Sequence, residues 1–216
     1  MKIGVLGTGV VGRTIGTRFA ALGHEVTMGS RTADNPDAAE WAAQVGTAAS
    51  HGTFADAAAA GELLFNCTSG AGSIDALVSA GPERVAGKVV VDVANPLDFS
   101  GGMPPSLSVC NTDSLGEQIQ RAFPDAMVVK TLNTMNCGIM VDPGSVPGDH
   151  VVFVSGNDEG AKTQVKHLLG SFGWGGSQII DLGDITTSRG PEMYLPLWLE
   201  LYGALGTGSF NINVVR

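Results

Sequence analysis

The stretch Lys2-Ile3-Gly4-Val5-Leu6-Gly7-Thr8-Gly9-Val10-Val11-Gly12 opens the chain and decides the fold. Its first half is an apolar run that predicts a β-strand, and its second half has the spacing GxGxxG. In such a strand–turn–helix the first glycine permits a tight turn, the second lets the backbone approach a diphosphate, and the third lets helix and strand pack closely. The stretch therefore predicts a dinucleotide-binding turn; a glycine-rich turn that binds nothing is the alternative.

A helix is expected directly after this turn, over residues 10–22. Apolar residues recur there at helical spacing, at Val11, Ile15, Phe19 and Leu22, and Gly23 ends the run. The helix N-terminus then points at the turn, where its N–H groups favour phosphate oxygens.

The first two thirds of the chain alternate between apolar strands and helices. We expect strands over residues 2–6, 24–28, 47–50, 62–67, 88–93 and 127–132, and helices over residues 10–22, 36–45, 53–60, 73–80 and 114–123. A loop rich in glycine and proline follows the fifth strand, over residues 95–105. This alternation predicts a Rossmann-type, doubly wound α/β fold with a mostly parallel sheet.

The character of the sequence changes after Asn133. Prolines and glycines interrupt residues 143–148, before an expected strand over 150–155, a helix over 158–172 and a strand over 178–181. The apolar run 185–205 predicts one helix or a broken pair. We therefore expect a nucleotide-binding domain over residues 1–137 and a small C-terminal α/β cap over residues 138–216.

Composition narrows the choice of partners. The chain has 216 residues, an apolar fraction of 44% and a net charge of −9, which argues against nucleic acid or an anionic membrane as partner. Cys67, Cys110 and Cys137 form no CxxC pair, so we expect reduced thiols, no metal site and a cytoplasmic location. The opening run meets Arg13 too early for a signal peptide, and the late apolar segment is too short to span a bilayer.

The residues after the second strand indicate which dinucleotide is bound. NAD-specific sites usually carry Asp or Glu there, whereas this chain has Met28-Gly29-Ser30-Arg31-Thr32. An arginine and a serine can bind a 2′-phosphate with charge-assisted hydrogen bonds of about 1.5–3 kcal/mol each. NADP(H) is therefore favoured, and the alternative is that Ser30 and Arg31 form a solvated loop.

The same residues resemble a known family. GTGVVG, then Gly23-His24-Glu25-Val26 and Gly29-Ser30-Arg31, are similar to the F-420-dependent NADP reductase family, which transfers hydride between NADP(H) and the deazaflavin coenzyme F-420. The cytosolic oxidoreductase domain of the STEAP-type metalloreductases is similar at the same places. The resemblance implies that Thr8, Ser30 and Arg31 surround the 2′-phosphate.

Two departures from the family's pattern bear on specificity. Asn35 stands where the family often has a further basic residue, which implies a less steep preference for NADP. The segment Lys130–Met135 matches the part of the family that lies beside the nicotinamide and deazaflavin rings. Archaeal reductases carry a histidine at the position of Asn133, whereas the metalloreductase domain has a pair like Asn133-Thr134. The acceptor is therefore F-420 or, alternatively, a flavin or a ferric chelate.

Direct hydride transfer between stacked rings requires proximity and orientation but no acid, base or metal from the protein. The loops at the carboxyl ends of the strands should form the pocket, and we name no catalytic residue. The residues expected to contact the cofactor are Gly7, Thr8, Gly9, Val10, Val11, Gly12, Ser30, Arg31, Cys67, Thr68, Ser69, Ala94, Asn95, Pro96, Asn133, Thr134 and Met135.

Several of these residues also have a purely structural explanation. Thr68 and Ser69 could cap a helix, and Asn95-Pro96 could simply end a strand. Cys67 is more often a small buried residue than a nucleophile. Lys130 and Asn133 have the Lys-x-x-Asn spacing of β-hydroxyacid dehydrogenases, but in a strand that spacing does not put both side chains on one helical face.

The predicted function is therefore an NADP(H)-dependent oxidoreductase that passes hydride to F-420 as a small-molecule co-substrate. A redox-sensing module that holds NADP(H) without turning it over is the alternative from another class. Leucines at 195, 197, 199 and 201 beside Trp198 indicate a homodimer interface or, alternatively, a segment folded back onto the first domain.

Overall fold

The opening apolar run forms a central strand of an eight-stranded sheet in this computed structural model, which describes residues 1–215. β1 (Lys2–Leu6) pairs in parallel with β2 (Glu25–Ser30) on one side and with β4 (Leu63–Asn66) on the other. The other strands are β3 (Ala49–Thr53), β5 (Val89–Asp92), β8 (Met127–Thr131), β9 (Val152–Gly156) and β10 (Ile179–Gly183). Their order is β10-β9-β8-β5-β4-β1-β2-β3.

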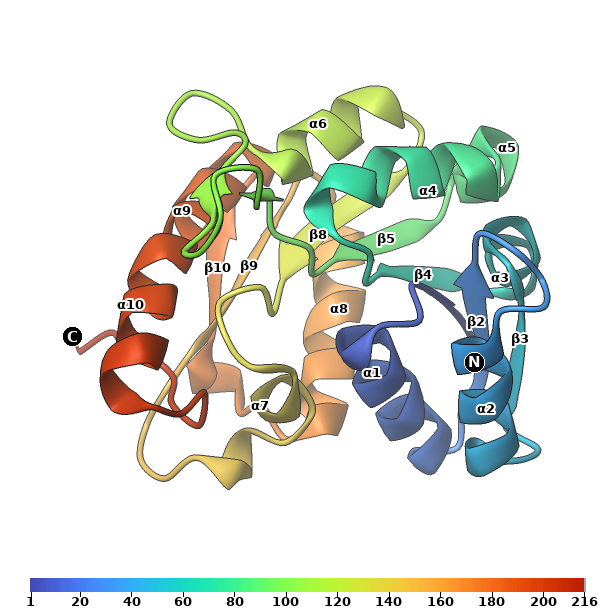
Figure 1. The fold of residues 1–216 in the computed structure, drawn as a ribbon, viewed down its shortest axis with the longest axis horizontal. Coiled ribbons are helices and arrows are strands. Elements are labelled where there is room, and N and C mark those ends of the chain that lie inside the picture. The colour runs from blue at the N-terminus through green and yellow to red at the C-terminus, as the bar shows by residue number, and fades with distance from the viewer. Residues whose placement is uncertain (216) are drawn as a thin grey trace.

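Helices cover both faces of this sheet (Figure 1). One face carries α4 (Ser73–Ala80), α5 (Pro82–Val85) and α6 (Leu115–Ala122), and the other carries α1 (Val10–Ala21), α2 (Pro36–Val45), α7 (Cys137–Val141) and α8 (Glu159–Phe172). α3 (Phe54–Ala60) follows β3, while α9 (Arg189–Met193) and α10 (Leu195–Leu205) lie at the β9–β10 end. The Rossmann-type α/β fold with a mostly parallel sheet is confirmed.

Local signals explain where several helices begin. The Asn35 side chain accepts a hydrogen bond from the Ala38 N–H at 3.0 Å, and Pro36 occupies the first turn of α2. Thr53 and Asp56 form a reciprocal capping box at the start of α3. Both motifs satisfy backbone N–H groups that would otherwise have no partner.

The C-terminal residues share the main hydrophobic core. Phe19 of α1 packs against Phe65 of β4 and Phe172 of α8, with ring centroids 5.1 and 4.7 Å apart. β9 pairs with β8 in the antiparallel direction and β10 continues the sheet in parallel with β9. Residues 138–215 thus extend the sheet of the first domain, and the boundary at residue 137 stays a prediction.

Several elements differ in detail from the sequence-based expectation. β2 runs on to Ser30, so Gly29 and Ser30 are part of the sheet edge that faces the site. The loop after β5 contains a short hairpin of β6 (Leu97–Asp98) and β7 (Ser106–Leu107). The last apolar run is a broken set of helices rather than one. Within residues 1–215, no helix has the length and apolar content needed to cross a membrane.

Candidate functional site

The strand order reverses at β1, because the chain moves outward to β2 and β3 on one side and to β4 and β5 on the other. Open α/β sheets bind ligands at such a switch point, outside the carboxyl ends of the strands. Two cavities of about 410 and 190 Å³ lie there. Cys67, Thr68 and Ser69, which follow β4, form a wall common to both.

The three glycines of the opening turn have three different steric roles. Gly7 has a φ of +119°, and a Cβ there would lie 2.6 Å from the carbonyl oxygen of Cys67. A Cβ on Gly12 would collide with the carbonyl oxygen of Gly7. A Cβ on Gly9, by contrast, would meet no protein atom within 4 Å, and Gly9 lines the larger cavity. Gly7 and Gly12 are thus required by the protein's own packing, whereas Gly9 keeps space open for a ligand.

The N-terminus of α1 is free to bind an anion. Its N-cap residue, Gly9, provides no side-chain hydrogen bond, and no acidic residue lies in the first turn of the helix. The first N–H groups of a helix have no partner within the helix, and the helix dipole favours negative charge at this end. A diphosphate seated over Gly9 would satisfy both conditions.

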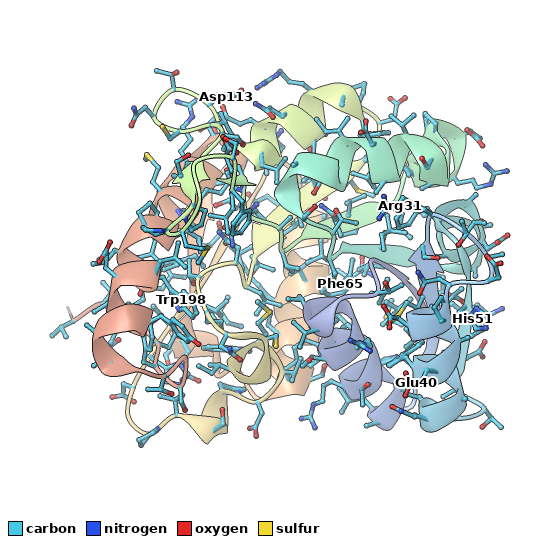
Figure 2. All side chains as sticks on the ribbon, viewed as in Figure 1. Arg31, Glu40, His51, Phe65, Asp113 and Trp198 are labelled. Carbon is cyan, nitrogen blue, oxygen red and sulfur yellow. The ribbon has the colours of Figure 1, made fainter. Side chains whose placement is uncertain are left out.

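The larger cavity extends from the glycine turn to the end of β2. Arg31 is exposed there, and Figure 2 shows it beyond β2 on the side toward α4. Ser30 is buried and its hydroxyl donates to the carbonyl oxygen of Thr32, while Asn35 lines the cavity and caps α2. Asp75 of α4 also lines this cavity. Arg31 is the one cationic side chain among the described lining residues.

The smaller cavity is lined mostly by apolar residues, together with the polar residues Thr68, Ser69 and Asn95. Its lining residues are Val11, Cys67, Thr68, Ser69, Gly70, Val93, Ala94, Asn95, Leu97 and Phe99. No carboxylate, imidazole or amine is among these residues, and no cluster of metal-ligating side chains was found in residues 1–215. Burial raises the pKa of the Cys67 thiol well above its usual range, and the charge of Asp92 raises it further. The cavity therefore presents no thiolate.

The polar residues after β8 lie beneath this cavity. Asn133 and Asn95 exchange two hydrogen bonds of 2.9 Å: the Asn95 amide donates to the Asn133 carbonyl, and the Asn133 amide donates to the Asn95 side chain. Thr134 and Met135 are buried and line neither cavity, and the Thr134 hydroxyl has no hydrogen-bond partner. Pro96 is likewise buried and lines neither cavity. Of the residues expected after β5 and β8, Ala94 and Asn95 line the cavity. Asn133 does not line it but is hydrogen-bonded to Asn95.

Some residues of the glycine turn line one of the two cavities and others line neither. Gly7, Thr8 and Gly9 line the larger cavity and Val11 lines the smaller one. Gly12 is buried under the turn, and Val10 begins α1 with an exposed side chain.

A buried polar network behind the two cavities was missed from the sequence. Lys130 forms ion pairs with Asp92 at 2.8 Å and with Glu192 at 2.8 Å, and all three side chains are at most 1% exposed. Asn66 donates to Asp92 and accepts from the Thr68 hydroxyl. Burial alone would lower the pKa of Lys130, but Asp92 and Glu192 raise it above its ordinary value, so the amine stays charged.

One signal for this network was present in the sequence. Asp92 and Lys130 each stand alone at the end of an apolar strand, and buried charges require partners. Nothing in the sequence pointed to Glu192. The structure also excludes a joint role for Lys130 and Asn133, because the first is held in the ion pairs and the second by Asn95.

Comparison with known proteins identifies the family. Residues 2–96 match the family model described as "NADP oxidoreductase coenzyme F420-dependent". A solved structure from Arthrobacter sp. FB24, named a "putative F420 dependent NADP-reductase", is 57% identical, covers 100% of both chains and has a TM-score of 0.94. The chain belongs to the F420-dependent NADP oxidoreductase family. It is therefore an oxidoreductase, and the resemblance inferred from GTGVVG and Gly29-Ser30-Arg31 is confirmed.

Two more distant proteins are also similar to this chain. The metalloreductase STEAP3 of Rattus norvegicus is 26% identical over 201 residues, which are 91% of this chain and 38% of that protein. The chain thus spans well under half of that relative. A reductive aminase from Aspergillus terreus superposes with a TM-score of 0.67 at 22% identity, over 95% of this chain and 62% of the other. At that identity the likeness shows a shared fold alone.

The state of Cys67 gives a prediction that needs no cofactor. At pH 8, iodoacetamide should modify the exposed Cys110 and leave Cys67 intact, because alkylation requires a thiolate and the pKa of Cys67 is raised by burial. Peptide mass mapping over a time course measures this, and the same reaction in denaturant should modify Cys67 as well. Equal rates at Cys67 and Cys110 in the folded protein would show that the thiol is accessible and ionised.

Proposed function

We propose that this protein binds NADP(H) across the two cavities and catalyses hydride transfer between the nicotinamide and F-420. The observation that carries the proposal is the pair of cavities joined at Cys67–Ser69, one reaching from the glycine turn to Arg31 and the other bounded by apolar residues. This division matches the two ends of a dinucleotide, an anionic adenosine phosphate end and an uncharged planar ring. The match to the family supports both molecules as substrates.

The diphosphate would lie over Gly9, where α1 offers unpartnered N–H groups and no side chain fills the space. The 2′-phosphate would lie beside Arg31. Ser30 would join it after turning its hydroxyl away from the Thr32 carbonyl, and Thr8 lines the same cavity.

The bound nicotinamide ring would donate the hydride in its reduced form and accept it in its oxidised form. The residues of this chain would orient the ring. Val11, Leu97 and Phe99 would surround it, and backbone and amide groups near Ala94 and Asn95 would hold its carboxamide. Fixed geometry of this kind removes much of the entropic barrier to a bimolecular step. The described lining holds no carboxylate, imidazole or amine, which suits hydride transfer, because that step needs no proton from the protein.

The test is a direct assay with the purified protein, NADPH and F-420, followed by the deazaflavin absorbance. We expect F-420 to be reduced, with FMN and a ferric chelate reduced much more slowly. Faster reduction of FMN or the chelate would favour the metalloreductase-like alternative, which the similarity to STEAP3 and the Asn133-Thr134 pair support. Tight NADPH binding with no acceptor reduced at any pH would favour a sensing module.

Arg31 should determine the preference for NADP. Replacing Arg31 with Ala should weaken NADPH binding about tenfold or more and leave NADH nearly unchanged, because one charge-assisted hydrogen bond contributes about 1.5–3 kcal/mol. Titration of cofactor fluorescence with each nucleotide measures both affinities. Equal losses for NADPH and NADH would show that Arg31 does not face the 2′-phosphate.

We also propose a homodimer formed through α10. Of its eleven residues only Leu195 is buried, while Leu197, Tyr202 and Leu205 are 55%, 49% and 56% exposed. Apolar residues gathered on one exposed helix are typical of an interface.

Sedimentation velocity tests this proposal. The native protein should sediment as a dimer and Leu197→Glu as a monomer, because a charge without a partner is costly in a buried interface. Val78→Glu is the matched control, since Val78 is also 55% exposed but lies on α4. A native monomer, or equal effects of both substitutions, would contradict the interface.

A further inference from the structure

A single buried ammonium joins three separate parts of the molecule. Lys130 Nζ lies 2.8 Å from a carboxylate oxygen of Asp92, 2.5 Å from the carbonyl oxygen of Ala94 and 2.8 Å from a carboxylate oxygen of Glu192. An ammonium has three protons, so every donor of Lys130 is used. These acceptors come from the end of β5, from the loop that follows it and from α9.

Glu192 is held just as completely. Its two carboxylate oxygens accept hydrogen bonds from the N–H groups of Leu115 and Gly116, at 2.8 and 3.0 Å, at the start of α6. Together with Lys130 they make three donors around one carboxylate. The glutamate is therefore fixed between α6 and the sheet, and α9 and α10 are fixed with it.

The other side of the network reaches the wall of the smaller cavity. Asp92 accepts from the Asn66 amide and from the backbone N–H of Ala94, and the Asn66 side chain accepts from the Thr68 hydroxyl. Ala94 and Thr68 both line that cavity. The chain of hydrogen bonds thus runs from α9, through Lys130, to two residues that line the space proposed for the nicotinamide.

Stability alone does not account for such a network, because burying an ion pair is often no better than packing apolar residues of the same size. Its geometric effect is specific, since it fixes the Ala94 carbonyl and the β5 loop in one position. We propose that Glu192, acting through Lys130, is a positioning residue. It holds the loop after β5, which lines the space proposed for the nicotinamide, in a fixed position relative to α9 and α10. This inference rests on the proposed placement of the nicotinamide.

The test compares Glu192→Gln with Glu117→Gln. Glutamine offers one oxygen to the three donors around position 192, so at least one link must break. Glu117 is the matched control: it is a buried carboxylate of α6 that also bonds this region, through Arg189, but its described hydrogen bonds and ion pairs include neither Lys130 nor the β5 loop. Both variants therefore weaken the attachment of the C-terminal segment, and only one disturbs the network.

Two readouts are needed, with thermal unfolding recorded for each variant. With the acceptor that the native protein reduces, Glu192→Gln should lower kcat about tenfold or more and change KM for NADPH by less than about twofold, because small misplacements cost rate rather than affinity. Without any acceptor, Glu192→Gln should bind NADPH normally but change the fluorescence lifetime of the bound reduced nicotinamide. Glu117→Gln should change neither quantity.

The outcomes separate this inference from the proposed function. Failure of the native protein to reduce any acceptor would contradict the proposed function. The fluorescence lifetime of bound NADPH would still test the positioning role of Glu192, because it needs no acceptor. Equal kcat and lifetime effects in both variants, or loss of thermal stability alone, would overturn the positioning role. If Glu192→Gln does not fold, Glu192→Asp replaces it, because aspartate keeps the charge but is one methylene too short to reach Lys130 and the N–H groups of Leu115 and Gly116 together, and the same outcomes apply.

Discussion

The lack of a side chain at Gly12 lets α1 begin directly against the carbonyl of Gly7, and the site depends on that contact. Any Cβ there would push the helix away from β1. With the helix seated, its uncapped N-terminus lies at the point where the strand order reverses. The glycine at position 9 then keeps that N-terminus open. Backbone geometry thus creates the proposed anion site, and only Arg31 adds a full positive charge among the described lining residues. A protein with a net charge of −9 can accordingly bind a polyanionic cofactor through local dipoles.

A second constraint acts beneath the loops that follow β4, β5 and β8. β4, β5 and β8 end in Asn66, Asp92 and the Lys130–Thr131 pair, so polar groups collect under the loops rather than in the sheet interior. These groups satisfy one another, which lets a charged cluster be buried at low cost. The cavity above has mostly apolar walls, and no carboxylate, imidazole or amine is among its described lining residues. A rigid polar base thus lies behind the cavity that is proposed to hold the nicotinamide ring.

The sequence revealed the local parts of this arrangement better than the distant ones. The glycine turn, the Asn35 cap and the Ser30-Arg31 pair were predictable because each depends on residues close together in the chain. The antiparallel direction of β9 was not predicted, since a strand buried on both faces gives no signal of its orientation. Glu192 was missed for a related reason: its partners are Lys130 and the start of α6, which only the folded chain brings together. The short β6–β7 hairpin has two residues in each strand, too few for a period to be seen.

The most direct measurement of the central claim is the affinity of Gly9→Ala for NADPH and NADH. A Cβ at this position meets no protein atom within 4 Å, and the residue has an extended backbone that alanine adopts freely, so the variant should unfold at the native temperature. The added methyl would nevertheless occupy the space above the helix N-terminus. Both nucleotides should then bind about tenfold more weakly or worse, a loss of roughly 1.4 kcal/mol or more. Native affinity for both nucleotides in a normally folded Gly9→Ala protein would contradict the claim that the diphosphate lies on this turn.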